Sequence, residues 1–331
     1  MIQTLSAVYG AAAAWRREWY ARHPEWQHRL DRPVISVGNL RVGGAGKTPI
    51  VAHLARLLVA RGERPAILTR GYGRRLSTAG VTVVSDGMRV LAGVDTAGDE
   101  PLMLARAVPG AIVAVSADRF LSGCLAERRL GATVHILDDG FQHFALARDV
   151  DLLVTGEDDL NDQPLPAGRL RESLGAARNA DAAIVDAGYL PAAERVGRAL
   201  SVPQVFRGTR LLGPPRMVQS GDTVVVPENS RVFATAGIAR PERFFADLSG
   251  ADWQVVGTMP FRDHHQFTAR DIERIAAAAK SSAASIILTT DKDAVRFAAC
   301  DLGDVPIAAV PLTATVEPAG EFSSWLLGRL Q

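Results

Sequence analysis

The stretch Arg41-Val42-Gly43-Gly44-Ala45-Gly46-Lys47-Thr48 decides the fold of this chain. An apolar run at residues 33–37 comes before it, and a helix-like stretch at residues 49–60 follows it. A strand, a glycine-rich turn and a helix in this order form a phosphate cradle, because backbone N–H groups and the helix N-terminus converge on phosphate oxygens. The lysine can reach the β- and γ-phosphates, and the threonine hydroxyl can bind Mg²⁺. The sequence therefore predicts a nucleoside triphosphate site, although Arg41 stands where the usual pattern has its first glycine.

The composition is that of a soluble α/β enzyme with two lobes. The chain has 331 residues, of which 47% are hydrophobic and 22% charged, and about 150 residues per domain is usual. A formal net charge of +1, without any block rich in lysine or arginine, argues against nucleic acid as a partner. Cys124 and Cys300 lie far apart in apolar surroundings, which favours reduced thiols over a disulfide or a zinc site.

Apolar strand-like runs alternate with helical stretches along most of the chain. This rhythm predicts an α/β fold with a doubly wound parallel sheet of the P-loop NTPase type. After residue 206 the rhythm is interrupted by glycine- and proline-rich turns, and it restarts near residue 230 as a second, smaller α/β lobe. The predicted parts are an amphipathic helix at residues 1–30, a P-loop domain at 31–206, a β-like linker at 207–229 and the smaller lobe at 230–331.

The first 30 residues form an amphipathic helix that admits two interpretations. An apolar stripe edged by arginines suits a helix lying in a membrane interface, but the same stripe suits a helix docked on its own domain. No segment reaches the ~18 apolar residues that a bilayer span needs, and the start lacks the basic region of a signal peptide. The stripe consists of Leu5, Val8, Ala12, Trp15 and Trp19, with Arg16, Arg17 and Arg22 beside it.

A pair of carboxylates follows the apolar run at residues 134–137. Asp138 and Asp139 stand where a P-loop protein places the acid that holds Mg²⁺, directly or through water. A solvated turn is the alternative, and the question of which carboxylate contacts the metal stays open. The P-loop about ninety residues upstream favours the metal site.

Two further segments combine carboxylates, histidines and turns. Asp99, in Gly-Asp-Glu-Pro at residues 98–101, opens a helix-like stretch and taken alone is best explained as a helix cap. His264 lies in a loop of the second lobe, where a histidine can orient a carboxylate but is more often merely solvated. Residues 69–74 and 168–172 place arginines beside turns, which suits either bound anions or surface ion pairs.

Together these motifs resemble one family, the tetraacyldisaccharide 4′-kinases of lipid A biosynthesis, in the same order through nearly the whole chain. The most specific strings are Asp-Asp-Gly-Phe-Gln-His at residues 138–143 and Gly-Asp-Glu-Pro at residues 98–101. One departure is Asp291, where such kinases often carry glutamate. The other matching segments are residues 36–40, 42–49, 69–72, 165–172, 261–264 and 290–295.

The resemblance implies transfer of the ATP γ-phosphoryl group, with Mg²⁺, to the 4′-hydroxyl of an acylated glucosamine disaccharide 1-phosphate. It also implies peripheral association with the cytosolic face of the inner membrane, and neither nucleic acid nor an obligate protein partner is expected. In this view Asp99 is the base, His264 supports it from the second lobe, and Lys47 stabilises the transferred group. Nucleotide binding falls to Arg41, Val42, Gly43, Gly44, Ala45, Gly46, Lys47 and Thr48, and the metal to Thr48, Asp138 and Asp139. The candidates for sugar and phosphate binding are Arg70, Tyr72, Arg119, Gln142, His143, Arg171 and Glu172.

The rival from another class is a membrane-recruited switch ATPase of the partitioning type. Its phosphate loop also reads Gly-Gly-x-Gly-Lys-Thr, and it too can use an amphipathic helix. Such loops carry a lysine immediately before the glycine pair, whereas this chain has Val42. Another small-molecule P-loop kinase fits the loop alone but leaves the tryptophan-rich helix and the second lobe unexplained.

Overall fold

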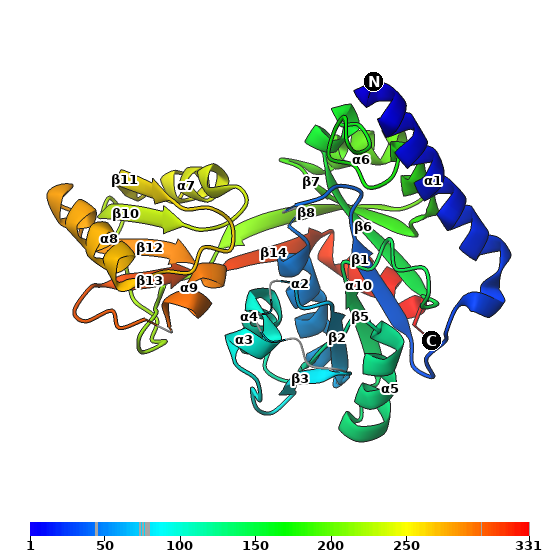
Figure 1. The fold of residues 1–331 in the computed structure, drawn as a ribbon, viewed down its shortest axis with the longest axis horizontal. Coiled ribbons are helices and arrows are strands. Elements are labelled where there is room, and N and C mark those ends of the chain that lie inside the picture. The colour runs from blue at the N-terminus through cyan, green and yellow to red at the C-terminus, as the bar shows by residue number, and fades with distance from the viewer. Residues whose placement is uncertain (44–45, 73, 75, 77–79, 299, 331) are drawn as a thin grey trace.

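A computed structural model describes residues 1–43, 46–72, 74, 76, 80–298 and 300–330. The chain folds into a large and a small α/β lobe that lie side by side and are joined by two long strands (Figure 1). The N-terminal helix runs along the outer side of the large lobe, opposite the small lobe (Figure 1). This arrangement agrees with the predicted two-lobed α/β architecture.

The large lobe is built on a mainly parallel sheet. Its strands are β1 (Val34–Gly38), β2 (Pro65–Thr69), β3 (Thr82–Asp86), β4 (Ile112–Val115), β5 (Val134–Asp138), β6 (Val150–Gly156), β7 (Ala182–Asp186), β8 (Val205–Leu212) and β14 (Leu312–Glu317). In the described part of the chain their order is β14-β8-β7-β6-β1-β5-β2-β4-β3. Neighbours from β8 to β4 pair in parallel, and among the described strands only the edge strands β14 and β3 are antiparallel. The predicted P-loop-type sheet is therefore confirmed.

Helices cover both faces of this sheet because its central strands are apolar on both sides. In β1, Ile35 and Val37 join the core beneath α2, whereas Val34 packs with the core on the α5 side. Such continuous burial is typical of parallel strands in doubly wound folds. The helices of this lobe are α1 (Ile2–Arg22), α2 (Lys47–Val59), α3 (Val94–Ala97), α4 (Asp99–Ala107), α5 (Arg119–Leu130), α6 (Leu190–Ala199) and α10 (Ala319–Gly328), with short 3₁₀ turns η1 (Pro24–Trp26), η2 (Glu157–Asn161) and η3 (Leu174–Asn179).

The small lobe repeats the α/β principle on a smaller scale. Its strands are β9 (Arg216–Met217), β10 (Arg231–Ala236), β11 (Gln254–Pro260), β12 (Ile286–Thr290) and β13 (Ile307–Val310). Their order in the described residues is β11-β10-β12-β13-β9, and all pairs are parallel except β13 with β9. The helices are α7 (Pro241–Ser249), α8 (Ala269–Ser281) and α9 (Asp291–Phe297).

The lobe boundaries differ from the predicted linker at 207–229 and smaller lobe at 230–331. β8 belongs to the large sheet, and β14 returns from the small lobe to pair with it over residues 312–317. α10 then completes the large core, where the ring of Phe322 lies 4.9 Å from that of Phe206. The last residues of the chain thus belong to the large lobe, because their apolar side chains cover strands that would otherwise be exposed.

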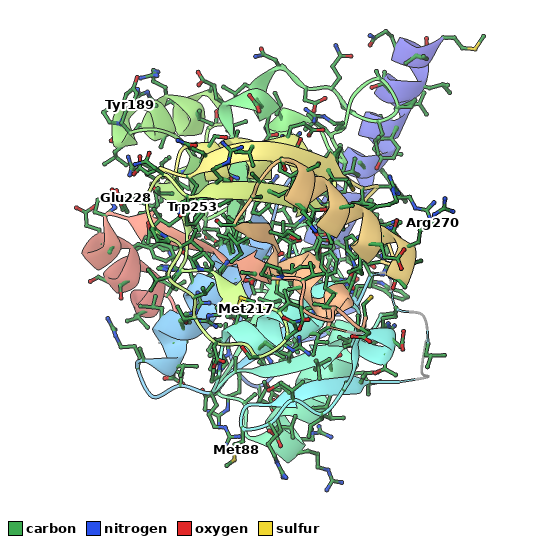
Figure 2. All side chains as sticks on the ribbon, turned by 90° about the vertical axis from the view of Figure 1, so that its left-hand side faces the viewer. Met88, Tyr189, Met217, Glu228, Trp253 and Arg270 are labelled. Carbon is green, nitrogen blue, oxygen red and sulfur yellow. The ribbon has the colours of Figure 1, made fainter. Side chains whose placement is uncertain are left out.

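Helix α1 docks through its polar face and leaves its apolar stripe in solvent. Leu5, Val8 and Trp15 are 54%, 63% and 68% exposed. On the docked side, Arg17 forms a bidentate ion pair with Glu172 at 2.7 and 2.8 Å. Figure 2 shows the first turns of this helix standing out beyond the body of the molecule. Docking of the whole stripe on its own domain is thus not observed, although Trp19 is half-buried. Among the described helices, none combines the length and apolar character that crossing a bilayer requires.

Candidate active site

A single large cavity between the lobes collects most of the predicted site residues. It has a volume of about 1460 Å³ and extends from the P-loop to α1 and to the small lobe. Asp99 lies just outside its lining, Arg41 lies elsewhere, and Gly44 and Ala45 fall outside the described residues. The predicted residues that line it are Val42, Gly43, Gly46, Lys47, Thr48, Arg70, Tyr72, Arg119, Asp138, Asp139, Gln142, His143, Arg171, Glu172 and His264.

The phosphate loop connects β1 to α2 in the predicted way. Gly46 caps α2 with φ of 75°, a left-handed conformation that favours glycine. Lys47 begins the helix, and its Nζ lies 2.8 Å from Oδ1 of Asn39 and 2.6 Å from Oδ1 of Asp139. The lysine is therefore held at the mouth of the loop by groups that a bound nucleotide would replace.

The side chain of Arg41 does not point at the phosphate loop. It is 5% exposed and pairs with Asp159, Nη1 to Oδ1 2.9 Å, where it lines a second, smaller cavity. Its carbonyl oxygen remains at the base of the loop and accepts a hydrogen bond from Arg171 at 3.0 Å. The side chain of Arg41 is thus held in an ion pair within the large lobe, because Asp159 offers a buried charge partner, and its predicted nucleotide contact stays a prediction.

Asp138 and Asp139 differ in their surroundings although they are neighbours. Asp139 adopts a φ of 59°, which is uncommon outside glycine, and both of its oxygens accept hydrogen bonds from Arg171 at 2.9 Å. Burial opposes ionisation, but the hydrogen bonds from Arg171 and the charge of Lys47 hold the pKa of Asp139 well below its usual range. Asp139 therefore orients two cations of the site.

Among the described residues, Asp138 has no cation in ion-pair contact. It is 5% exposed, and the hydrogen bond found for it comes from the Thr69 hydroxyl at 3.3 Å. Burial, followed by the charge of Glu100, raises the pKa of Asp138 to about 7. A buried carboxylate with no ion pair among the described residues, lining the same cavity as Thr48, supplies the kind of oxygen donor that Mg²⁺ prefers. The described residues hold no cluster of three or more histidine, cysteine or acidic side chains suited to a metal.

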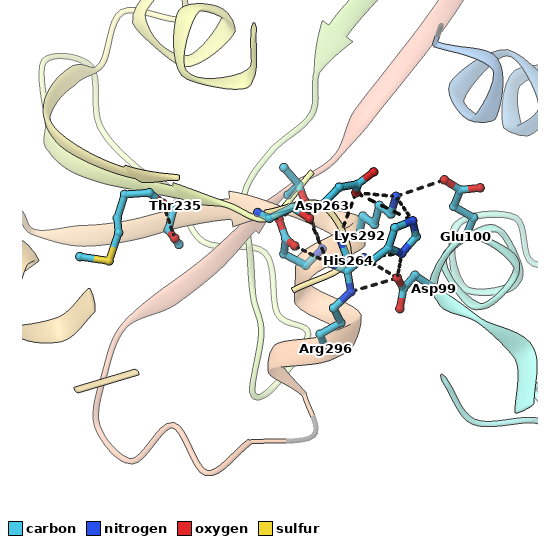
Figure 3. Close-up of polar contacts among 11 residues, drawn as sticks. Asp99, Glu100, Thr235, Asp263, His264, Lys292 and Arg296 are labelled. Atoms are coloured by element: carbon cyan, nitrogen blue, oxygen red, sulfur yellow. Dashed lines mark hydrogen bonds and ion pairs between the residues drawn. The ribbon is translucent and has the colours of Figure 1, made fainter. Parts of the chain in front are cut away.

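The carboxylate of Asp99 is not a helix cap. Gly98 occupies the N-cap position of α4, with no side-chain cap bond, and Asp99 instead turns toward the small lobe. Its Oδ2 lies 3.0 Å from Nδ1 of His264 and accepts hydrogen bonds from Arg296 (Figure 3). His264 sits in a tight turn with φ of 59°, its N–H bonded to the carbonyl of Gly237 at 3.2 Å. The two predicted catalytic residues thus meet across the lobes.

Several residues of this contact escaped sequence reasoning. Arg296 and Lys292 lie on α9, and Lys292 approaches Oε1 of Glu100 on α4 at 3.3 Å (Figure 3). Lys292 lies in the family-like segment at residues 290–295, which by itself gives it no role. For Arg296 the signal is Asp293 three residues earlier, a spacing that places both on one helix face. Asn39, which contacts both Lys47 and Arg171, lies in the family-like segment at residues 36–40, but its place after the first strand does not by itself indicate these contacts.

Cationic groups line the cavity beyond the carboxylates. Arg119 is 6% exposed and makes a hydrogen bond to the Ala117 carbonyl at 3.3 Å, but within the described residues it has no carboxylate in ion-pair contact. Burial, followed by the neighbouring charge of Arg70, lowers the pKa of Arg119. Burial and the charges of Arg119 and Arg148 lower the pKa of His143 to about 4. This part of the cavity is suited to an anionic or strongly hydrogen-bonding ligand.

Glu172 has a structural contact in addition to its place in the cavity. It is 2% exposed and receives Arg17 of α1 as well as the amide of Gln142 at 2.9 Å. The guanidinium of Arg17 also lies 4.3 Å from the ring centre of Phe141. Glu172 therefore anchors α1 to the wall of the cavity.

A phosphate loop with its lysine, a carboxylate pair at the end of β5 and a second lobe that contacts the site define a P-loop kinase. The family model described as tetraacyldisaccharide-1-P 4′-kinase matches residues 1–331, and the chain belongs to this family. A tetraacyldisaccharide 4′-kinase of Desulfotalea psychrophila is 41% identical over 305 residues, covering 88% of this chain and 86% of the relative. That of Geobacter sulfurreducens is 39% identical over 312 residues, covering 93% and 86%.

A solved structure agrees with this membership. The Aquifex aeolicus LpxK, crystallised in complex with ATP, matches 100% of this chain and 98% of its own with a TM-score of 0.79 and 29% identity. The predicted P-loop kinase fold and the predicted family are thus confirmed, and the switch-ATPase alternative is not supported.

Proposed function

We propose that this protein transfers the γ-phosphoryl group of ATP to the 4′-hydroxyl of a tetraacylated glucosamine disaccharide 1-phosphate, giving lipid IVA. The observation that carries the proposal is the single cavity that joins the phosphate loop, the cationic wall and α1. The bond between the 4′-oxygen and the γ-phosphorus forms, the bond from that phosphorus to the β,γ-bridging oxygen breaks, and ADP leaves.

In this proposal Asp99 accepts the proton that the sugar hydroxyl loses, and His264 orients the carboxylate. The 3.0 Å contact between the two supports these roles, since a base must be held in place before it can act. Because Asp99 lies on the large lobe and His264 on the small one, the pair exists only while the lobes touch. Closure of the lobes would then precede transfer.

Lys47, the backbone of the phosphate loop and Mg²⁺ would stabilise the charge on the transferred group. Thr48 and Asp138 are the residues that would hold the metal, with further ligands from phosphate oxygens and water. When bound, Mg²⁺ neutralises the charge that develops on the β- and γ-phosphates. Asp139 would release Lys47 toward the nucleotide while keeping its own contact with Arg171.

The acceptor would lie along the cationic wall formed by Arg70 and Arg119, beside the uncharged imidazole of His143. Arg119 supports this, because a nearly buried guanidinium with no carboxylate in contact in the described part of the chain is suited to a phosphate or to sugar hydroxyls. Tyr72 and Gln142 border the same space. The wall is continuous with Ala12, Ala13 and Arg16 of α1, so acyl chains could leave the cavity along this helix.

Helix α1 would place the cavity at the cytosolic face of the inner membrane. Its exposed apolar stripe supports peripheral attachment, because an apolar face edged by arginines partitions into the interface of an anionic bilayer. The acceptor is itself a lipid, so attachment would bring enzyme and substrate to the same surface.

The test is transfer of radiolabelled γ-phosphate from ATP to tetraacyldisaccharide 1-phosphate in detergent. Label in the lipid phase, absent without acceptor and with the Lys47→Ala variant, is the expected result. Release of labelled inorganic phosphate at the same rate with and without acceptor would instead identify an ATPase.

A further inference from the structure

One oxygen of Asp99 accepts hydrogen bonds from two residues of the small lobe. Its Oδ2 lies 3.0 Å from Nδ1 of His264 and 2.9 Å from Nε of Arg296, and Nη2 of Arg296 contacts the same oxygen (Figure 3). An ionised carboxylate only accepts, so the imidazole donates from Nδ1. Its Nε2 is then free to accept from Lys292, 3.4 Å away. A ring with its hydrogen on Nδ1 satisfies both contacts, and Nη2 of Arg296 lies 3.3 Å from the same nitrogen.

Arg296 is built rigidly into the small lobe. Its side chain is 1% exposed, and Nη1 donates to Oδ1 of Asp293 at 2.9 Å and to the carbonyl of Gly237 at 3.0 Å. Asp293 is fully buried and accepts the N–H of Gly237 at 2.9 Å, which ties α9 to the end of β10. Because Nη1 of Arg296 is already held by these two contacts, the guanidinium loses little conformational entropy when it binds Asp99.

We propose that Arg296 is a positioning residue for phosphoryl transfer, which holds Oδ2 of Asp99 together with His264 and leaves Oδ1 to take the proton of the acceptor hydroxyl. Within the described residues, Oδ1 makes no hydrogen bond, so it is the oxygen available to substrate. The hydroxyl O–H bond breaks as the new O–P bond forms, and the proton ends on Oδ1. This inference rests on the proposed role of Asp99 as the base.

The arrangement also makes the orientation of Asp99 depend on contact between the two lobes. Asp99 lies on α4 and both of its donors lie on the small lobe, 165 and 197 residues away in sequence. When the lobes separate, Asp99 loses every donor described above and is free to rotate. An oriented base would thus exist only when the lobes are in contact. This would slow the unwanted transfer of the phosphoryl group to water.

Arg296 brings a positive charge into direct contact with the carboxylate of Asp99. Burial alone would raise the pKa of Asp99, but the hydrogen bonds from His264 and then Arg296 lower it below its usual range. Loss of Arg296 should therefore raise that pKa. The other charged or titratable groups on the elements packed around Asp99 are Tyr72 and Arg74 after β2, Asp95 on α3, Glu100 on α4, Asp263 beside His264, and Lys292 and Asp293 on α9.

The test compares the pH profile of kcat/KM in Arg296→Met and Arg296→Lys with the wild type. In Arg296→Met we expect kcat to fall on the order of 10²-fold and the acidic limb to move up by about one unit or more, because an adjacent arginine lowers a carboxyl pKa by about 1–3 units. Arg296→Lys keeps the positive charge but loses the planar guanidinium with its several N–H donors. The position of its acidic limb should therefore stay unchanged while kcat falls about tenfold. Arg274→Met removes an exposed arginine of α8 and should change neither quantity.

A double-variant comparison separates this inference from the proposed base. If Arg296 acts through Asp99, adding Arg296→Met to Asp99→Asn should cost little further activity. Full activity of Asp99→Asn would overturn the base and the inference with it. An inactive Asp99→Asn beside an Arg296→Met variant whose activity falls equally at all pH values would overturn the inference alone. Should Arg296→Met not fold, unchanged kcat in a folded Arg296→Lys would overturn it.

Discussion

The ammonium of Lys47 lies 2.6 Å from Oδ1 of Asp139, so the lysine of the phosphate loop is paired with a carboxylate from the end of β5. Nη2 of Arg171 lies 2.9 Å from the same oxygen. Asp139 therefore keeps one cation partner when Lys47 turns to a nucleotide. The lysine can therefore turn to a phosphate without leaving the carboxylate of Asp139 unpaired.

Lys47→Ala should lower turnover by a factor on the order of 10² or more, because the ammonium stabilises charge on the transferred phosphoryl oxygens. The melting temperature without ligand should stay nearly unchanged, since Arg171 still pairs with Asp139. Steady-state kinetics and thermal melting measure both. Lys280→Ala, a charge loss on the exposed side of α8, is the control. Activity within about threefold of wild type would contradict the role of the loop.

Asp99→Ala and His264→Ala should each reduce kcat by about 10²–10⁴-fold, because general-base contributions have this size. The double variant should be little worse than the poorer single one, since the two side chains act as a unit. Single-turnover kinetics on all three variants test this. Independent multiplication of the two losses would show that the 3.0 Å contact does not carry the chemistry.

In the folded protein without metal, Asp138 should contribute stability that is lost as pH rises from about 4 to about 7, opposite in sign to the contribution of His143, whose pKa is lowered. The pKa of Asp138 is raised to about 7 by burial, while the unfolded chain titrates near 3.9, so in this range the folded state holds a proton that the unfolded state has released. The effect is measured by comparing the melting temperatures of the wild type and of Asp138→Asn across this pH range in the presence of a metal chelator. The variant should lack this part of the pH dependence, and identical profiles would contradict the shift.

Mg²⁺ should reverse that trend, because the cation binds the ionised carboxylate and competes with the proton. We expect the affinity for Mg²⁺ in the presence of nucleotide to rise with pH through about 7, as measured by calorimetry. In Asp138→Asn the affinity should fall and lose this dependence. Unchanged affinity in the variant would remove Asp138 from the metal site.

Replacement of Leu5 and Trp15 by serine should release the protein from anionic vesicles and raise the apparent KM for the lipid acceptor. Both side chains are more than half exposed, so the melting temperature should change little. Vesicle sedimentation and detergent-free kinetics test the two effects. Tyr189→Ser, an exposed aromatic side chain at the start of α6, serves as control. Early melting with unchanged vesicle binding would contradict the interfacial role of α1.

The sequence by itself determined the phosphate cradle, the parallel strands around it and the carboxylates at the end of β5. These features are local: glycines permit the turn, apolar runs form buried strands, and side chains that follow parallel strands meet at one sheet edge. Most residues assigned to the cleft therefore line one cavity, although they come from distant parts of the chain.

Only the tertiary structure decided which partner each of these residues has. Helical periodicity showed that Leu5, Val8 and Trp15 share a face, but it cannot say whether that face meets protein or solvent. Likewise, Asp99 reads as a helix cap until the small lobe brings His264 and Arg296 to it. Such contacts join residues far apart in sequence, and they arise from how β8 and β14 set the two lobes against each other, a relationship that no short-range pattern contains.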